Sequence, residues 1–162
     1  MDKITPCIWC NFNAKEQIDF YVSLLPDSRI NSVVRWPMDG SGPNEGRKKG
    51  DDLVIDFTLG GRNFIGLVGG PNFPYTEAFS MSVVCEDQAE VDRLWSKLTA
   101  DGGKEVACGW LKDKYGLAWQ IVPRRMYELL ADKDTAKASR AMNAMMQMVK
   151  LDIGKIEAAA KS

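Results

Sequence analysis

The chain repeats one order of predicted elements, and this repetition limits the folds it can adopt. In the first half, a strand at residues 4–12 precedes an amphipathic helix that begins at Asn13, and further strands follow. In the second half, a strand at residues 79–85 precedes a helix that begins at Asp87, and strands follow again. We therefore predict an α+β fold with duplicated βαβββ modules, about residues 1–70 and 75–124.

Both predicted helices begin with the same capping chemistry. Asn13 and Asp87 belong to the residue types that cap helix N-termini through their side chains. A glutamate follows three residues later in each case, Glu16 and Glu90, which is the spacing of a capping box. Apolar residues then recur at i, i+3, i+4 and i+7, so each helix should pack one face on a sheet.

Residues 52–59 alternate between apolar and polar side chains. Successive strand residues point to opposite faces, so Asp56 and Thr58 should lie opposite Ile55 and Phe57. Gly60 and Gly61 then predict a two-residue hairpin turn. If helices cover the apolar face of each sheet, the two modules can pair into a cupped mixed sheet whose concave side is the natural place for a small molecule.

The remaining elements follow from composition and punctuation. We predict strands at residues 29–36, 62–68, 105–111 and 117–122, a long glycine-rich and charged loop at 37–50, and a turn at 113–116. After Pro123 we predict helices at residues 124–130, from Asp134 or Thr135 to about Lys150, and at 153–160. Residues 1–124 should therefore form one domain and residues 125–162 a helical extension, in which methionines fill gaps in the packing.

The sequence contains no histidine, and this excludes two classes of enzyme. Serine–histidine hydrolases and histidine-ligated zinc enzymes both need the residue. The formal net charge is −1, so the protein does not have the excess of basic residues that is typical of nucleic-acid-binding proteins. No stretch is long and apolar enough for a membrane span, and the N-terminus has no signal-peptide pattern, so we expect a cytoplasmic protein with reduced cysteines.

Cys7 and Cys10 have the Cys-x-x-Cys spacing of redox and zinc sites. Here the pair lies within a predicted strand, where side chains at this spacing point to opposite faces. We therefore predict that both are small buried hydrophobic residues.

Several segments distributed along the chain resemble a known family. These segments are residues 14–21 with 25–28, 59–64, 85–95, 108–120 and 141–146. They are similar to the PhnB-like family, whose members carry the name 3-demethylubiquinone-9 3-methyltransferase, within the glyoxalase/bleomycin-resistance/dioxygenase (vicinal oxygen chelate) superfamily. The resemblance implies the fold of that superfamily for residues 1–124, and often a homodimer.

The resemblance also implies where a metal would bind. Metal enzymes of the superfamily draw one ligand from each of four strands, and the matching positions here are Pro6, Asp56, Ser80 and Gln120. One carboxylate and one amide do not complete a transition-metal site. We therefore expect neither a metal nor another cofactor, unless an unassigned ligand such as Glu77 or Glu105 moves into the cup.

Six residues are predicted to contact a ligand: Asp56, Thr58, Ser80, Gln120, Trp9 and Trp110. A carboxylate can orient a substrate or act as a general base, and Gln120 offers both a donor and an acceptor. The polar residues are equally compatible with a solvated strand face, and the tryptophans with core packing. No residue is assigned a catalytic role.

Three functions remain open. The first is a small-molecule-binding protein or metal-independent enzyme that holds its ligand in the sheet cavity. The second is a metal-dependent glyoxalase- or dioxygenase-type enzyme, and the third is a non-catalytic dimer whose cavity is filled by side chains. The family's name also implies methyl transfer to a ubiquinone precursor, although the glycine-rich turn of nucleotide-type methyltransferases does not follow the first strand.

Overall fold

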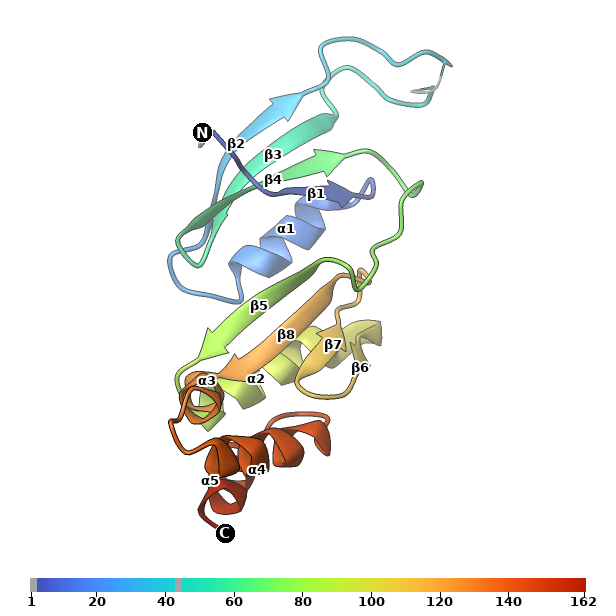
Figure 1. Ribbon diagram of the computed structural model, residues 1–162. Coiled ribbons are helices and arrows are strands. Elements are labelled where there is room, and N and C mark those ends of the chain that lie inside the picture. The colour runs from blue at the N-terminus through green and yellow to red at the C-terminus, as the bar shows by residue number, and fades with distance from the viewer. Residues whose placement is uncertain (1–2, 43–44) are drawn as a thin grey trace. The chain divides into compact units, whose positions relative to one another are not determined.

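The computed structural model describes residues 3–42 and 45–162, which form two units that divide between Pro74 and Tyr75 (Figure 1). Each unit contains one four-stranded mixed sheet and a helix on one of its faces. The predicted α+β class is confirmed. Pro43 and Asn44, which belong to the predicted loop at 37–50, lie outside the described residues.

The first unit contains one βαβββ module. Its elements are β1 (Cys7–Cys10), α1 (Ala14–Val22), β2 (Arg29–Arg35), β3 (Asp52–Leu59) and β4 (Arg62–Val68). The strand order is β1-β4-β3-β2, with β1 parallel to β4 and the other pairs antiparallel. Strands β3 and β4 have the predicted bounds, and the Gly60–Gly61 turn has both φ angles positive, at 54° and 76°.

The second unit repeats this topology. Its module consists of β5 (Ser80–Cys85), α2 (Gln88–Thr99), a 3₁₀ turn η2 (Ala100–Gly102), β6 (Lys104–Glu105), β7 (Trp110–Lys112) and β8 (Ala118–Pro123). The strand order is β5-β8-β7-β6, again with a parallel pair between the first and last strands. The predicted duplication of a βαβββ module is therefore confirmed, whereas the pairing of the two modules into one cup stays a prediction.

The single strand predicted at residues 105–111 is wrong. The chain forms a hairpin there, in which the Val106 amide donates to the Trp110 carbonyl at 2.8 Å. Cys108 and Gly109 take left-handed conformations, with φ of 60° and 82°, and reverse the chain between β6 and β7. This hairpin supplies the strand that the second module lacks in the sequence-based prediction.

Each helix packs on its sheet through the apolar face that the alternation predicts. In the first unit, Ile18 and Tyr21 of α1 are buried together with Ile55 and Phe57 of β3. Gly66 of β4 lies directly beneath Ile18, because a Cβ added there would be 2.4 Å from the Ile18 Cδ1 atom. The helix approaches β4 closely at this point, and the missing side chain permits it.

The two helix starts differ, contrary to the prediction. Asp87 accepts a hydrogen bond from the Glu90 amide at 2.8 Å, and Glu90 in turn accepts one from the Glu86 amide at 2.9 Å. Asn13 occupies the N-cap position of α1, but its side chain makes no capping hydrogen bond. The prediction of two side-chain caps therefore holds for α2 alone.

Three helices complete the second unit: α3 (Arg124–Leu130), α4 (Thr135–Met146) and α5 (Ile153–Lys161). Helix α4 ends at Met146 rather than near Lys150, since residues 148 and 149 instead pair with the β6–β7 turn. There the Cys108 and Gly109 amides donate to the carbonyls of Met148 and Val149, each at 2.8 Å. This pairing joins the helical extension to the module.

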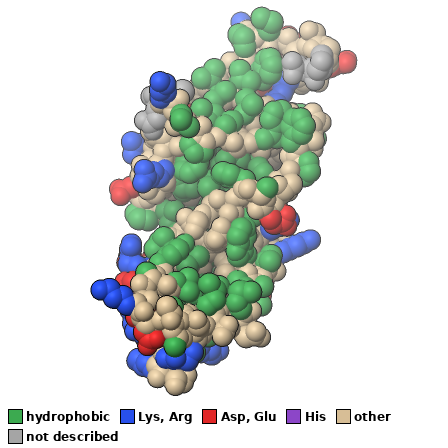
Figure 2. Space-filling view, viewed as in Figure 1, with side chains coloured by type: hydrophobic (Ala, Val, Ile, Leu, Met, Phe, Trp, Pro, Cys, Tyr) green, Lys and Arg blue, Asp and Glu red, His purple; other side chains and the backbone are tan. Residues whose placement is uncertain are grey.

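Helices α3, α4 and α5 also pack around a small hydrophobic core of their own. It consists of Met126, Leu129, Ala141, Leu151, Ile156 and Ala160. Met145 and Met148 pack against this core, as predicted for the methionines, whereas Met142 and Met146 are exposed. Basic and acidic side chains are interspersed over this region (Figure 2), and Arg125 forms ion pairs with both Glu128 and Glu157.

Among the described residues, no helix combines the length and the apolar character that crossing a membrane requires.

Candidate functional site

The strand registers show which residues share the face of each sheet that lies opposite its module's helix. We call this the helix-free face. In the first unit, Asp56 is paired with Ile65 and Thr58 with Asn63, while Trp9 of β1 is paired with Leu67. All of these alternate with the buried residues that contact α1. The three ligand-contacting residues predicted in the first unit therefore lie on one helix-free face.

A hydrogen-bonded polar cluster occupies part of this face. The Asn31 Nδ2 atom donates to Asp56 Oδ1 at 2.9 Å and is 3.0 Å from Thr58 Oγ1. The Thr58 hydroxyl is in turn 3.1 Å from Asn63 Oδ1. Asn31 reaches the cluster at a register irregularity between Ile30 and Ser32 of β2. The cluster connects three neighbouring strands and fixes the orientation of Asp56.

Apolar side chains flank the polar cluster on the same face. They are Val54 of β3, Ile65 and Leu67 of β4, and Trp9 of β1. The Trp9 indole is held by a hydrogen bond from Nε1 to the Gly70 carbonyl at 2.8 Å, and its ring contacts Phe73 edge-on, with the centroids 4.7 Å apart. The face thus combines one carboxylate and two amides with an apolar surface.

The other three predicted residues lie on the helix-free face of the second sheet. Gln120 of β8 is paired with Ser82 of β5 on one side and Trp110 of β7 on the other. Its Nε2 atom donates to the Ser80 hydroxyl at 2.9 Å, and the amide oxygen takes no part in this hydrogen bond. Trp119, by contrast, faces α2 and is 1% exposed, so it belongs to the core.

A lysine on this second face is absent from the residues predicted from the sequence. Lys112 shares the face with Trp110 and Gln120, and its Nζ atom forms a 2.6 Å ion pair with Glu77. The hydrogen bond from Lys112 lowers the pKa of the Glu77 carboxyl. The alternation of residues 110–112 could have indicated Lys112, but the misplaced strand at 105–111 obscured it.

The residues proposed as metal ligands do not gather into a site within either unit. Among the described residues, no three histidine, cysteine or acidic side chains lie close enough together to hold a metal ion. Glu105 accepts a 2.6 Å hydrogen bond from the Trp95 indole on the helix side of its sheet, and Glu77 is paired with Lys112. Both alternative ligands therefore have other partners.

The Cys-x-x-Cys pair divides between the two faces of the first sheet, as predicted. Cys10 is buried beneath α1, but Cys7 is exposed, so the prediction that both are buried is wrong for Cys7. Desolvation raises the pKa of the Cys7 thiol, the opposite of what a reactive thiolate requires. All four cysteines are free thiols.

Comparison with known families matches residues 2–122 to the model described as 3-demethylubiquinone-9 3-methyltransferase. The chain belongs to this PhnB-like family. A PhnB protein from Bacillus cereus that carries the same methyltransferase name is 34% identical, with a TM-score of 0.65 over 75% of this chain and 99% of that one. A Pseudomonas aeruginosa protein of 21% identity shares the fold, with a TM-score of 0.58 over 76% of this chain and 98% of that one.

The family match ends within β8, so helices α3, α4 and α5 lie beyond it. No curated protein matches the chain significantly. Membership of the PhnB-like family therefore comes from the two modules, and the chemistry has to be inferred from their helix-free faces.

Proposed function

We propose that this PhnB-like protein is a glyoxalase-like, small-molecule-binding protein or metal-independent enzyme whose ligand lies against the helix-free faces of its sheets. The observation that carries the proposal is the polar cluster of Asn31, Asp56, Thr58 and Asn63 within an apolar strand face. Ligand sites are commonly apolar surfaces with a few oriented polar groups.

The cluster favours a ligand that donates a hydrogen bond. Asn31 engages one oxygen of the Asp56 carboxylate, and no described residue donates to the other oxygen. A carboxylate held by a neighbouring amide needs no reorientation when a ligand binds, which lowers the entropic cost of recognition. The apolar residues Ile65 and Leu67 would contact the hydrocarbon part of such a ligand.

The same geometry supports an enzymatic role for Asp56. A carboxylate within hydrogen-bond reach of a substrate proton can serve as a general base without a metal. The family's methyltransferase name offers a second candidate reaction, methyl transfer to a ubiquinone precursor, which requires a methyl donor to bind.

A metabolite screen by thermal shift, followed by calorimetry on each hit, tests the proposal. We expect a hit whose affinity falls about tenfold or more in Asp56→Asn and in Thr58→Val, because each change removes part of the oriented cluster. Asp19→Asn is the matched control, since Asp19 lies on the exposed side of α1 and pairs only with Lys15. Equal affinities in Asp56→Asn and wild type would overturn the assignment of the face.

Two further measurements separate the alternatives. Elemental analysis of chelator-treated protein and titration with manganese, nickel, zinc and iron(II) test the metal-dependent glyoxalase or dioxygenase. Binding of S-adenosylmethionine in the same calorimeter tests methyl transfer. Stoichiometric metal that is lost in Asp56→Ala would contradict the metal-independent proposal.

We further propose a cytoplasmic homodimer. Four free thiols are compatible with a reducing compartment, and exposed apolar side chains such as Val34 and Val84 on the helix-free faces suit an interface. Sedimentation velocity at several concentrations measures the oligomeric state, and a monomer at all of them would reject the dimer.

A further inference from the structure

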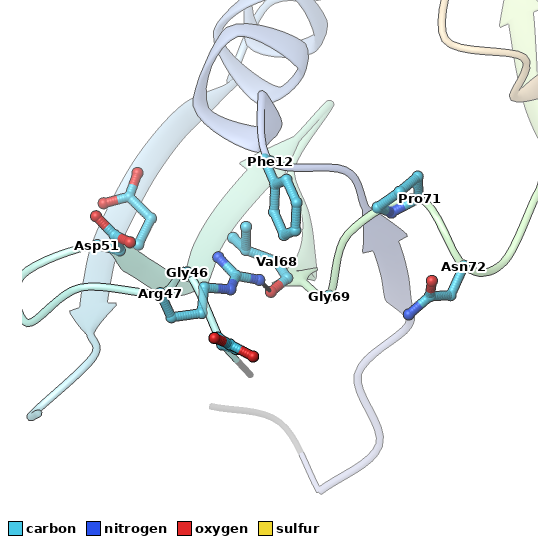
Figure 3. Close-up of a pocket in the computed structure, with 10 residues that line it drawn as sticks. Phe12, Gly46, Arg47, Asp51, Val68, Gly69, Pro71 and Asn72 are labelled. Atoms are coloured by element: carbon cyan, nitrogen blue, oxygen red, sulfur yellow. Dashed lines mark hydrogen bonds between the residues drawn. The ribbon is translucent and has the colours of Figure 1, made fainter. Parts of the chain in front are cut away.

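A second candidate site is a pocket in the first unit. This pocket has a volume of about 580 Å³, within the range of small-molecule sites. It lies where β1 and β4 end, beside the loop that joins β2 to β3 (Figure 3). Its lining includes Phe12, Glu45, Arg47, Asp51, Asp52 and Val68. None of the six ligand-contacting residues predicted from the sequence lines it.

Arg47 extends from the loop toward Phe12 and Val68, as Figure 3 shows. Its guanidinium carbon lies 4.5 Å from the centroid of the Phe12 ring and 5.8 Å from that of Trp36. An Nη2 hydrogen bond to the Val68 carbonyl fixes its direction. Stacking on aromatic rings together with this bond orients the guanidinium without neutralising it.

The acidic residues of the pocket do not pair with Arg47. Asp52 instead forms a 2.5 Å ion pair with Arg35, and Asp51 accepts a hydrogen bond from the Lys48 amide at 2.8 Å. Among the described residues, Arg47 has no carboxylate partner and Glu45 has no cationic one. The pocket therefore contains the oriented positive charge of Arg47 and negative charges that do not form ion pairs with it.

We propose that this pocket binds a small zwitterion, such as a free amino acid. The ligand's carboxylate accepts hydrogen bonds from Arg47, and its ammonium group lies toward Glu45 and Asp51. Hydrogen bonds between ionised groups are stronger than neutral ones, and a guanidinium matches a carboxylate in shape. A simple anion would be repelled by the carboxylates and a simple amine by Arg47, whereas a zwitterion complements both charges.

Calorimetry or ligand-observed NMR with glycine, leucine and phenylalanine tests the proposal. For the best binder, the matched probes are its N-acetyl derivative, which lacks the cation, and the corresponding decarboxylated amine, which lacks the anion. We expect the free amino acid to bind about tenfold or more tightly than either probe. Failure of all three amino acids to bind, or equal binding of the amine, would overturn the proposal.

Two variants locate the binding. Arg47→Met and Glu45→Gln should each weaken amino-acid binding about tenfold, since each removes one of the two charges. Thermal unfolding of both variants monitors folding. If Arg47→Met unfolds, Glu45→Gln still decides the question, because Glu45 is exposed and we expect its replacement to leave the fold intact. Unchanged binding in Glu45→Gln would overturn the proposal.

A third variant separates this pocket from the helix-free face. Asp56→Asn should leave amino-acid binding unchanged, because Asp56 does not line the pocket. Conversely, Arg47→Met should leave the binding of metabolites at the polar cluster unchanged. If Asp56→Asn abolishes amino-acid binding, the ligand lies on the helix-free face, and the pocket is rejected as its site.

Discussion

The two βαβββ modules share a strand order but differ in the charged residues of their helix-free faces. The first face carries both signs, with Asp56 and Arg29 beside asparagines and a threonine. The second carries Lys104 and Lys112 near Gln120. In each module, the buried residues between helix and sheet are mostly apolar. The comparison shows that one set of alternating positions maintains the topology while the other is free to change its chemistry.

The modules also differ in how the helix packs against the sheet. The last strand of each module runs between the first and third strands. On its helix-facing side the first module has Gly66, and the second has Trp119. Gly66 allows α1 to approach closely, whereas the Trp119 side chain is buried and its indole donates a hydrogen bond to the Asp113 carboxylate. The stability of the first unit should therefore be sensitive to added volume, and that of the second to lost volume.

Trp119→Ala should produce the largest effect of a single substitution. Removing a buried tryptophan costs about 3–5 kcal/mol of unfolding free energy. It also removes the 2.8 Å hydrogen bond from the indole to Asp113, a buried carboxylate that also accepts from the Tyr115 and Leu117 amides. Chemical denaturation measures the loss.

Thiol labelling assigns that loss to a unit. Cys85 and Cys10 are each 0% exposed, one in each unit, so each becomes reactive only when its own unit opens. In Trp119→Ala we expect Cys85 to react first. Earlier reaction of Cys10 would contradict the assignment of the effect to the second unit.

Gly66→Val should destabilise the first unit by about 1–3 kcal/mol, the usual cost of overpacking a core. The added atoms would meet the Ile18 Cδ1 atom, which lies 2.4 Å from an ideal Cβ. Ile18→Val removes that carbon, so the double variant should recover part of the loss. Denaturation of the wild type, the two single variants and the double variant gives the coupling free energy between the two positions. Additive losses would show that the added side chain does not clash with Ile18.

The stability of the second unit should fall at alkaline pH because of the buried thiol of Cys85. Desolvation, with a smaller contribution from Glu90, raises the pKa of Cys85 to about 12, from 9.0 in the unfolded chain. The stabilisation is complete below pH 9 and is lost as the pH rises toward 12, by about 1.4 kcal/mol per pH unit. Urea denaturation at pH 8 and pH 10 should show this decline in the wild type, reduced in Cys85→Ala. Identical declines would contradict the burial effect.

The sequence predicts the first module better than the second for a physical reason. Strong alternation and a Gly-Gly turn define β3 and β4, and both strands have the predicted bounds. The β6–β7 hairpin turns at Ala107, Cys108 and Gly109, of which only the glycine favours a turn, and its conformation depends on the pairing of Cys108 and Gly109 with the α4–α5 connection. Such long-range contacts cannot be inferred from local pattern.

The candidate sites show the same limit. Strand alternation placed Asp56 and Thr58 on a helix-free face, and the resemblance to the PhnB-like family indicated Gln120. Asn31 escaped prediction because a register irregularity brings it beside Asp56. The Arg47 pocket depends on a loop side chain that reaches Phe12 and Val68, which only the folded chain brings together.

The N-caps of α1 and α2 allow a closely matched comparison of the two modules, with the smallest expected effects. Asp87→Ala should cost about 1 kcal/mol, because it leaves the Glu90 amide without its acceptor at the start of α2. Asn13→Ala, at the corresponding position of α1, should change the unfolding free energy by much less, because the Asn13 side chain makes no capping bond. Denaturation of the two variants under one condition measures the difference. Equal losses would mean that Asn13 caps α1 in solution, and the modules would then be more alike at their helix starts than their hydrogen bonds indicate.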